Sequence, residues 1–179
     1  MGLFPYRQGL ESKLYRHQFD AMNQALVNRK NIVATTGTGS GKTECFLFPL
    51  VYDILVEKLK RNAPKPAIRG LILYPLNALA EDQMRRLRRS LSSSSAVQWL
   101  DDNANGNRIT FGRYTGSTPF SGRETRERAN ALRSEKESLE IEWASARQQA
   151  TESGDQDYLF DVPNMDKGVN AELWDRWSM

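Results

Sequence analysis

Residues 36–43 read Thr-Gly-Thr-Gly-Ser-Gly-Lys-Thr, and they restrict the fold more than any other part of the chain. The apolar stretch 31–35 precedes them and is typical of a buried strand. Apolar residues then recur with helical spacing from Phe46 to Leu59. A glycine-rich loop between a strand and a helix, ending in Gly-Lys-Thr, is the setting of a phosphate-binding P-loop. The pattern therefore predicts an α/β domain that binds a nucleoside triphosphate.

The residue types of this loop suit phosphate. Glycines let backbone N–H groups turn toward phosphate oxygens, and the helix N-terminus adds partial positive charge. Lys42 would reach the β- and γ-phosphates, and the Thr43 hydroxyl would hold Mg²⁺. An accidental glycine-rich turn is the alternative, since the strict pattern has glycine at position 36. The predicted ATP and Mg²⁺ contacts are Thr36, Gly37, Thr38, Gly39, Ser40, Gly41, Lys42 and Thr43, with Lys42 and Thr43 as catalytic residues.

A predicted helix from about Tyr15 to Asn28 lies ahead of the loop and begins with Leu-Tyr-Arg-His-Gln. The Gln18 amide offers a donor and an acceptor that match N6 and N7 of adenine. Tyr15 is close enough in sequence to stack on the base. The alternative is an ordinary helix start with a glutamine on the surface. The spacing to the P-loop favours adenine recognition by Tyr15 and Gln18.

Composition limits the class of protein. The chain has 179 residues, 39% of them hydrophobic, and no run approaches the roughly 20 apolar residues of a membrane span. A single cysteine, Cys45, rules out an internal disulfide, and a single histidine, His17, makes a histidine-based metal site unexpected. We expect a reducing, cytoplasmic setting. The net charge of +3 is compatible with a nucleic-acid partner but too small to argue for one.

Further strands and helices alternate after the P-loop. Strands are predicted at 70–74 and 108–114, with a helix from Leu76 to Leu91 between them. This order predicts a parallel sheet flanked by helices within residues 1–120. Residues 121–179 hold a densely charged segment to about 151, predicted as a long, mostly solvated helix or a pair of helices, and an irregular tail with Trp174 and Trp177.

Two segments after the predicted strands suit contact with a nucleic-acid backbone. Pro75 starts a helix whose polar first turn includes Asn77. Helix N-termini at the carboxyl edge of a parallel sheet bind phosphate. The alternative is that these residues only end a strand and start a helix. The second segment, 113–119, offers hydroxyls and N–H groups after the third strand, and a plain loop is its alternative.

The helix from Leu76 to Leu91 also carries a run of basic residues. Met84, Leu87 and Leu91 would form its inner face. We interpret the arginines outside that face as solvated and give them only a secondary nucleic-acid role. They are Arg85, Arg86, Arg88 and Arg89.

Taken in order, these segments resemble the first half of a superfamily 2 DEAD/DEAH-box helicase. The matching runs are Leu-Tyr-x-His-Gln, Thr-Gly-Thr-Gly-Ser-Gly-Lys-Thr-Glu, Leu-Tyr-Pro-Leu-Asn-Ala-Leu-Ala-x-Asp-Gln and Tyr-Thr-Gly, within about residues 10–120. The likeness is greatest to large bacterial helicases of DNA repair and of phage-defence systems such as DISARM. It implies a RecA-like fold, an ATP-hydrolysing family and a DNA or RNA partner. It also implies nucleic-acid contacts at Pro75, Asn77, Gln83, Thr115 and Gly116.

Family members also carry an acidic Asp-Glu box that binds Mg²⁺ and activates water, and a second RecA-like domain with an arginine finger. The 179 residues contain no Asp-Glu-x-His/Asp box, and Asp101-Asp102 is predicted to lie in a loop. We therefore expect an amino-terminal helicase fragment that is inactive alone, with the remaining helicase or a companion subunit as partner. Two alternatives stay open: a nucleotide-dependent binding or regulatory protein without catalysis, and a P-loop ATPase unrelated to helicases. Gln18 and the 74–77 segment argue against the second.

Overall fold

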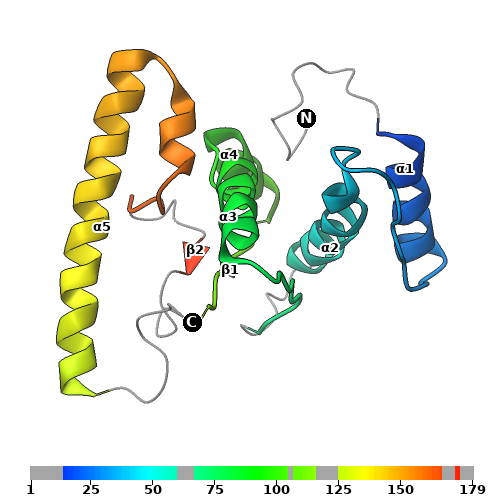
Figure 1. Cartoon of the computed structure of the whole chain (residues 1–179), viewed down its shortest axis with the longest axis horizontal. Coiled ribbons are helices and arrows are strands. Elements are labelled where there is room, and N and C mark those ends of the chain that lie inside the picture. Colours follow the sequence, from blue (N-terminus) through cyan, green and yellow to red (C-terminus); the bar gives the residue numbers. More distant parts are fainter. Residues whose placement is uncertain (1–13, 60–66, 105–106, 116–124, 167–171, 174–179) are drawn as a thin grey trace. The chain divides into compact units, whose positions relative to one another are not determined.

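The computed structural model describes residues 14–59, 67–104, 107–115, 125–166 and 172–173 (Figure 1). The chain forms two compact units, which divide between Leu71 and Ile72. The boundary predicted near residue 120 lies outside the described residues. Within the described part of the chain, the helices are too short or too polar to cross a lipid bilayer.

The first unit is built from two helices that pack together on either side of the glycine-rich loop. Helix α1 spans Arg16–Met22 and continues into a π-helical turn, η1, over Asn23–Val27. Helix α2 spans Lys42–Lys58 and packs against α1. Both helices were predicted, and both are confirmed. Their shared core consists of Ala21, Cys45, Leu47, Val51 and Leu55.

The second unit contains the remaining elements. Helix α3 spans Asn77–Leu91 and α4 spans Ser94–Ala104. Helix α5, over Arg126–Ser153, begins at Thr125, whose side chain accepts a hydrogen bond from the Arg128 N–H. It ends at Gly154, which has a φ of 74°, and the chain folds back into the 3-10 turn η2, Gln156–Phe160 (Figure 1). The core of this unit includes Met84, Leu91, Leu100, Ile109 and Trp143.

The predicted sheet is largely wrong for the described residues. Strand β1 is only Phe111–Gly112, and it pairs in parallel with β2, Glu172–Leu173. The predicted strands 31–35 and 70–74 have no strand structure. Their apolar side chains lie open, with Val33 87% and Leu73 81% exposed. A strand needs a hydrogen-bonded neighbour, and apolar runs indicate suitability for burial without supplying that neighbour.

Helix α4 was missed, and this corrects the position of two acidic residues. Asp101 and Asp102 lie in the last turns of α4 rather than in a loop. Asp101 forms an ion pair with Arg108 at 3.2 Å, and Ala96, Leu100 and Ala104 of the same helix are buried in the core. The serine run 92–95 suggested only the end of the preceding helix. In the structure Ser92 and Ser93 separate two helices, and Ser94 and Ser95 already belong to α4.

Candidate nucleotide and nucleic-acid sites

The glycine-rich loop folds into a tight turn that leads directly into α2. Gly39 and Gly41 have φ values of 74° and 79°, in the left-handed region that side chains disfavour. The Ser40 hydroxyl donates to the Gly37 carbonyl and lies 2.7 Å from the Thr36 hydroxyl. Helix α2 begins at Lys42, immediately after the turn. The loop therefore places a helix N-terminus and several backbone N–H groups close together.

Lys42 lies across this turn. Its ammonium donates to the carbonyl oxygens of Thr36 at 2.6 Å and Gly37 at 2.5 Å. Because backbone carbonyls carry only partial charge, an anion with full charges would be a stronger partner for the same ammonium. Thr43 is the second residue of α2 and is half-buried. The cation and the hydroxyl predicted to serve a triphosphate thus both lie at the start of α2.

Helix α1 holds the loop through two side chains. Gln18 is 0% exposed, and its Nε2 donates to the Gly41 carbonyl at 3.0 Å. Its Oε1 accepts from the Tyr15 N–H, also at 3.0 Å. His17 Nε2 lies 2.9 Å from the Ser40 carbonyl, so this nitrogen carries the proton and donates. Tyr15 is exposed and stacks on the His17 ring at 5.6 Å between centroids.

Sequence reasoning missed this linking role of Gln18. A Cβ at Gly41 would lie 2.4 Å from Gln18 Nε2 and 3.0 Å from a carboxylate oxygen of Glu44. The backbone conformation therefore favours glycine at 41, and a Cβ there would also displace the buried Gln18 amide. A glutamine predicted to face a ligand gives no signal in the sequence that it also bonds a loop carbonyl.

Glu44 and Cys45 lie buried on the first turn of α2, behind the loop. Burial raises the pKa of the Cys45 thiol, and the neighbouring Glu44 carboxylate raises this pKa further. The thiol therefore stays protonated near neutral pH and packs as a small apolar group.

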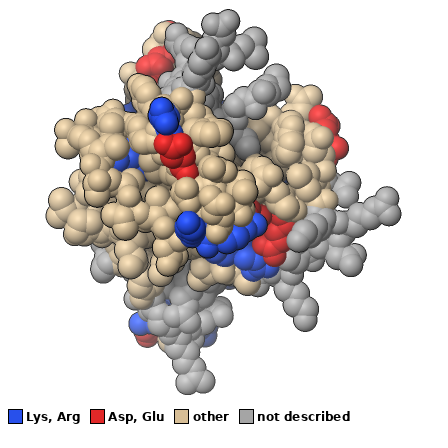
Figure 2. Space-filling view, turned by 90° about the vertical axis from the view of Figure 1, so that its right-hand side faces the viewer, with Lys and Arg blue, Asp and Glu red and all other residues tan. Residues whose placement is uncertain are grey.

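Two arginines on the surface of the first unit pair with acidic side chains. Arg29 pairs with Asp53 at 3.0 Å, and Arg69 pairs with Glu57 at 2.8 Å through a two-pronged contact. Figure 2 shows blue and red atoms lying next to one another on a mainly uncharged face.

The predicted nucleic-acid residues differ in exposure within the second unit. Pro75 and Asn77 are exposed, with Asn77 at the start of α3. Gln83 is buried, and its Nε2 donates to Asp82 at 3.3 Å. Thr115 is half-buried, and Gly116 lies outside the described residues.

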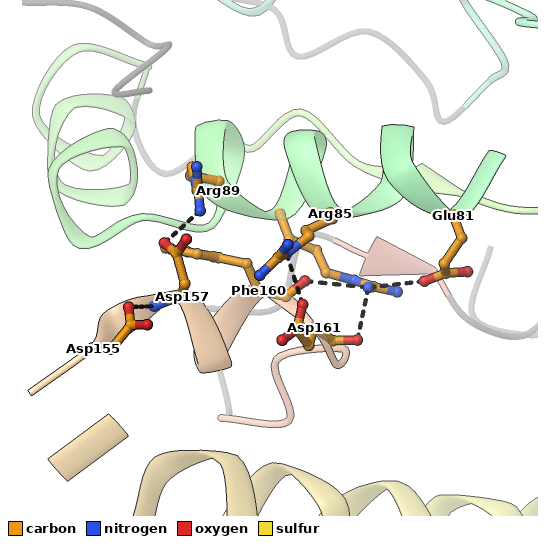
Figure 3. A network of polar contacts seen from close by, with 8 residues as sticks. Glu81, Arg85, Arg89, Asp155, Asp157, Phe160 and Asp161 are labelled. Atoms are coloured by element: carbon orange, nitrogen blue, oxygen red, sulfur yellow. Dashed lines mark hydrogen bonds and ion pairs between the residues drawn. The ribbon is translucent and has the colours of Figure 1, made fainter. Parts of the chain in front are cut away.

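Two arginines of α3, Arg85 and Arg89, face the turn η2 in an ionic network (Figure 3). Arg85 pairs with Asp161 at 2.7 Å, while Arg89 pairs with Asp157 and lies over the Phe160 ring at 5.4 Å. The Asp155 carboxylate in turn accepts from the Asp157 N–H. The acidic turn therefore neutralises part of the basic face of α3.

The prediction that the Arg88 side chain is solvated is wrong. It is 6% exposed and pairs with Glu81 at 3.1 Å. The same guanidinium donates to the carbonyls of Phe160 at 3.3 Å and Asp161 at 3.2 Å. A charge can be buried when hydrogen bonds and an opposite charge replace its water. Helical periodicity does not reveal such a partner, because it lies more than seventy residues away.

No three His, Cys, Asp or Glu side chains gather closely enough to hold a metal ion among the residues that the structure describes.

Comparison with known proteins gives one family over most of the chain. Residues 15–117 match the family described as DEAD/DEAH box helicase. Druantia protein DruE of Escherichia coli (strain UMEA 4076-1) is 40% identical over 123 residues, which is 67% of this chain and 7% of DruE. ATP-dependent RNA helicase DBP9 of Eremothecium gossypii is 30% identical over 119 residues, 63% of this chain and 20% of DBP9.

A third relative matches a shorter stretch. ATP-dependent RNA helicase CHR1 of Candida albicans is 46% identical over 54 residues, which is 30% of this chain and 9% of CHR1. The chain thus spans one fifth or less of the length of these relatives. No solved structure matches it.

Proposed function

The chain belongs to the DEAD/DEAH box helicase family, and from this premise we propose that residues 36–43 bind ATP and Mg²⁺ in an ATP-dependent nucleic-acid helicase or translocase. The observation that carries the proposal is the position of Lys42. Its ammonium lies against the Thr36 and Gly37 carbonyls at the N-terminus of α2. A helix N-terminus, a glycine turn and a lysine at one place form the chemistry that triphosphates require.

The residues of the loop fit this ligand. Left-handed Gly39 and Gly41 allow the backbone to turn its N–H groups inward, and a side chain at Gly41 would collide with Gln18. Lys42 would exchange its carbonyl partners for the β- and γ-phosphates, and Thr43 would hold Mg²⁺. Bound ATP–Mg²⁺ would supply a phosphoryl group whose transfer to water drives movement along a nucleic acid.

Adenine recognition is assigned to α1. Tyr15 is exposed and already stacks on an aromatic ring, so its face suits a purine. Gln18 makes one bond with each end of its amide, which leaves one further donor and one further acceptor lone pair. We assign these to adenine; because the Gln18 side chain is 0% exposed, this role requires the amide to become accessible when the nucleotide binds.

The proposed contacts with the DNA or RNA backbone lie in the second unit, at Pro75, Asn77, Gln83, Thr115 and Gly116. The exposure of Pro75 and Asn77 at the start of α3 supports this assignment, since a helix N-terminus attracts phosphate. The family implies a RecA-like α/β fold.

Hydrolysis is expected to need groups that this sequence does not contain. Turnover depends on an acidic box that positions metal and water, and on an arginine finger that is worth about 10³–10⁵ in rate. The chain has Lys42 and Thr43 but no Asp-Glu-x-His/Asp box. We propose that it binds ATP and nucleic acid and that turnover requires a longer helicase chain or a companion subunit. Phosphate release with saturating single-stranded DNA tests this, and turnover that is lost in Lys42→Ala would refute it.

Calorimetry tests the nucleotide site directly. Parent protein should bind ATP–Mg²⁺, and Lys42→Ala should abolish binding. Lys58→Ala is the matched control, because it removes a lysine from the last turn of the same helix. Equal affinity of the parent and Lys42→Ala proteins would reject the P-loop assignment. Comparison of ATP with GTP tests the base: Gln18→Ala should lose the preference for ATP, and an unchanged preference would remove Gln18 from this role.

A further inference from the structure

The Glu81 carboxylate joins two segments that the proposed function assigns to nucleic-acid binding. One oxygen, Oε1, pairs with Arg88 Nη1 at 3.1 Å on the same helix. The other, Oε2, pairs with Nη1 of Arg113, just beyond β1. Each carboxylate oxygen thus meets a different guanidinium.

Arg88 gives this carboxylate a fixed support. Its side chain is 6% exposed and is also bonded to the carbonyls of Phe160 and Asp161, so its position is set by η2. An isolated surface ion pair must order two free side chains and therefore contributes little. Here one partner of Glu81 is already held, and less conformational entropy remains to be lost when Arg113 pairs with it.

Glu81 and Arg113 each lie close in sequence to a residue that is proposed to contact nucleic acid. Asn77 lies one helical turn before Glu81 on α3, and residues four apart share a helix face. Thr115 follows Arg113 by two residues. The Glu81–Arg113 contact spans 32 positions of sequence and ties the Thr115 segment to the first turns of α3.

We propose that Glu81 is a positioning residue for nucleic-acid binding: through Arg113 it fixes the spacing between Asn77 and Thr115 to match the backbone of a single-stranded nucleic acid. The inference rests on the proposed function of these two residues. It assigns to Glu81 no contact with the nucleic acid itself.

The direction in which one substitution changes the affinity for nucleic acid distinguishes a positioning role from an effect of charge alone. Removing a carboxylate beside a polyanion-binding surface should strengthen binding if charge alone matters. If Glu81 positions the two segments, Glu81→Gln should weaken binding although it removes a negative charge. Asp82→Asn is the matched control, since the neighbouring carboxylate pairs with Arg86 on the same helix at 3.0 Å. The Asp82→Asn side chain keeps an oxygen that can accept a hydrogen bond from Gln83.

The experiment measures fluorescence anisotropy of labelled oligothymidine and oligouridine with the full chain, in the presence of ATP–Mg²⁺ and over a range of salt. Glu81→Gln should bind about fivefold more weakly, which corresponds to about 1 kcal/mol. The slope of log affinity against log salt should stay at the parent value, because no phosphate contact is lost. Asp82→Asn should bind as tightly as the parent or more tightly.

Affinity of Glu81→Gln equal to or above that of the parent would overturn the inference, and so would an equal loss in Asp82→Asn. If Glu81→Gln does not fold, Arg113→Gln decides. A similar loss with an unchanged salt slope supports positioning, whereas parent affinity or a slope reduced by about one rejects it. A parent protein that binds neither oligonucleotide refutes the proposed function instead.

Discussion

Alanine substitutions in the glycine-rich loop should differ in their effect on stability by amounts that the loop geometry sets. Gly41 has a φ of 79°, and a Cβ there would lie 2.4 Å from Gln18 Nε2. Gly39 has a φ of 74° and no atom within 4 Å of its ideal Cβ position. Gly37 also has no atom within 4 Å and no φ in the left-handed region. The three sites therefore separate backbone strain from side-chain collision.

The expected magnitudes follow from these contacts. Gly39→Ala should lower the free energy of unfolding by about 1–2 kcal/mol, the strain of an L-residue in the left-handed region. Gly41→Ala carries the same strain and also displaces the buried Gln18 amide from the Gly41 carbonyl. An orphaned buried polar group costs about 1–3 kcal/mol, so the total is about 2–5 kcal/mol. Gly37→Ala should be neutral or stabilising by up to about 1 kcal/mol, because alanine restricts the unfolded chain.

Urea unfolding followed by circular dichroism measures all three variants against the parent. The order of stability should be Gly37→Ala, then Gly39→Ala, then Gly41→Ala as the least stable. Gly41→Ala combined with Gln18→Ala should lose less than the sum of the two single changes, since the collision is absent. If Gly41→Ala were no less stable than Gly39→Ala, the packing of Gln18 against the loop would be refuted.

Three further predictions concern single side chains. Arg88→Met should lower the free energy of unfolding by about 2–4 kcal/mol, because Glu81 and two carbonyls lose a buried partner. Arg86→Met, at an exposed ion pair, should change the free energy of unfolding by about 0.5 kcal/mol. Equal effects of the two substitutions in thermal unfolding would contradict the network. Burial raises the pKa of Cys45, so its contribution to stability is fully present below the pKa of an unfolded thiol, about 8.5, and is lost as the pH rises through the raised folded value. Mass spectrometry should accordingly find slow alkylation of Cys45 in the native protein at pH 8 and rapid alkylation in urea, whereas equal rates would exclude a buried thiol. Thr125→Ala should destabilise α5 by about 0.5–2 kcal/mol through loss of its cap, and Thr125→Ser should restore it.

Most helices except α4 were predictable from local sequence, but most strands were not. Apolar spacing around Ala21 and Leu47 indicated α1 and α2, because a helix satisfies its own backbone hydrogen bonds. Val33 and Leu73 lie in runs that suit burial, yet a strand requires a neighbour that may be distant in sequence. The pairing of Phe111 with Glu172 illustrates this dependence, since no local pattern connects those two positions.

Within the candidate site, too, local features were predictable and contacts between distant positions were not. The loop, Lys42 and Thr43 follow from a contiguous motif, and the structure places them together at the start of α2. The roles of Gln18 and Arg88 depend on partners 23 and 72 positions away, which no spacing rule supplies. The residues that belong to the site were therefore easier to predict than the groups to which they bond.

The bond between Arg88 and the end of η2 also has a consequence for the order of folding. It closes a loop of 72 positions, and the entropic term of such a closure is about 4 kcal/mol. Helix α5 and η2 are adjacent in sequence and pack together, so their contacts form without that penalty. We therefore expect α5 and η2 to associate first and to dock on α3 late, after the main barrier. Substitution of Arg88 should then speed unfolding while leaving the folding rate almost unchanged.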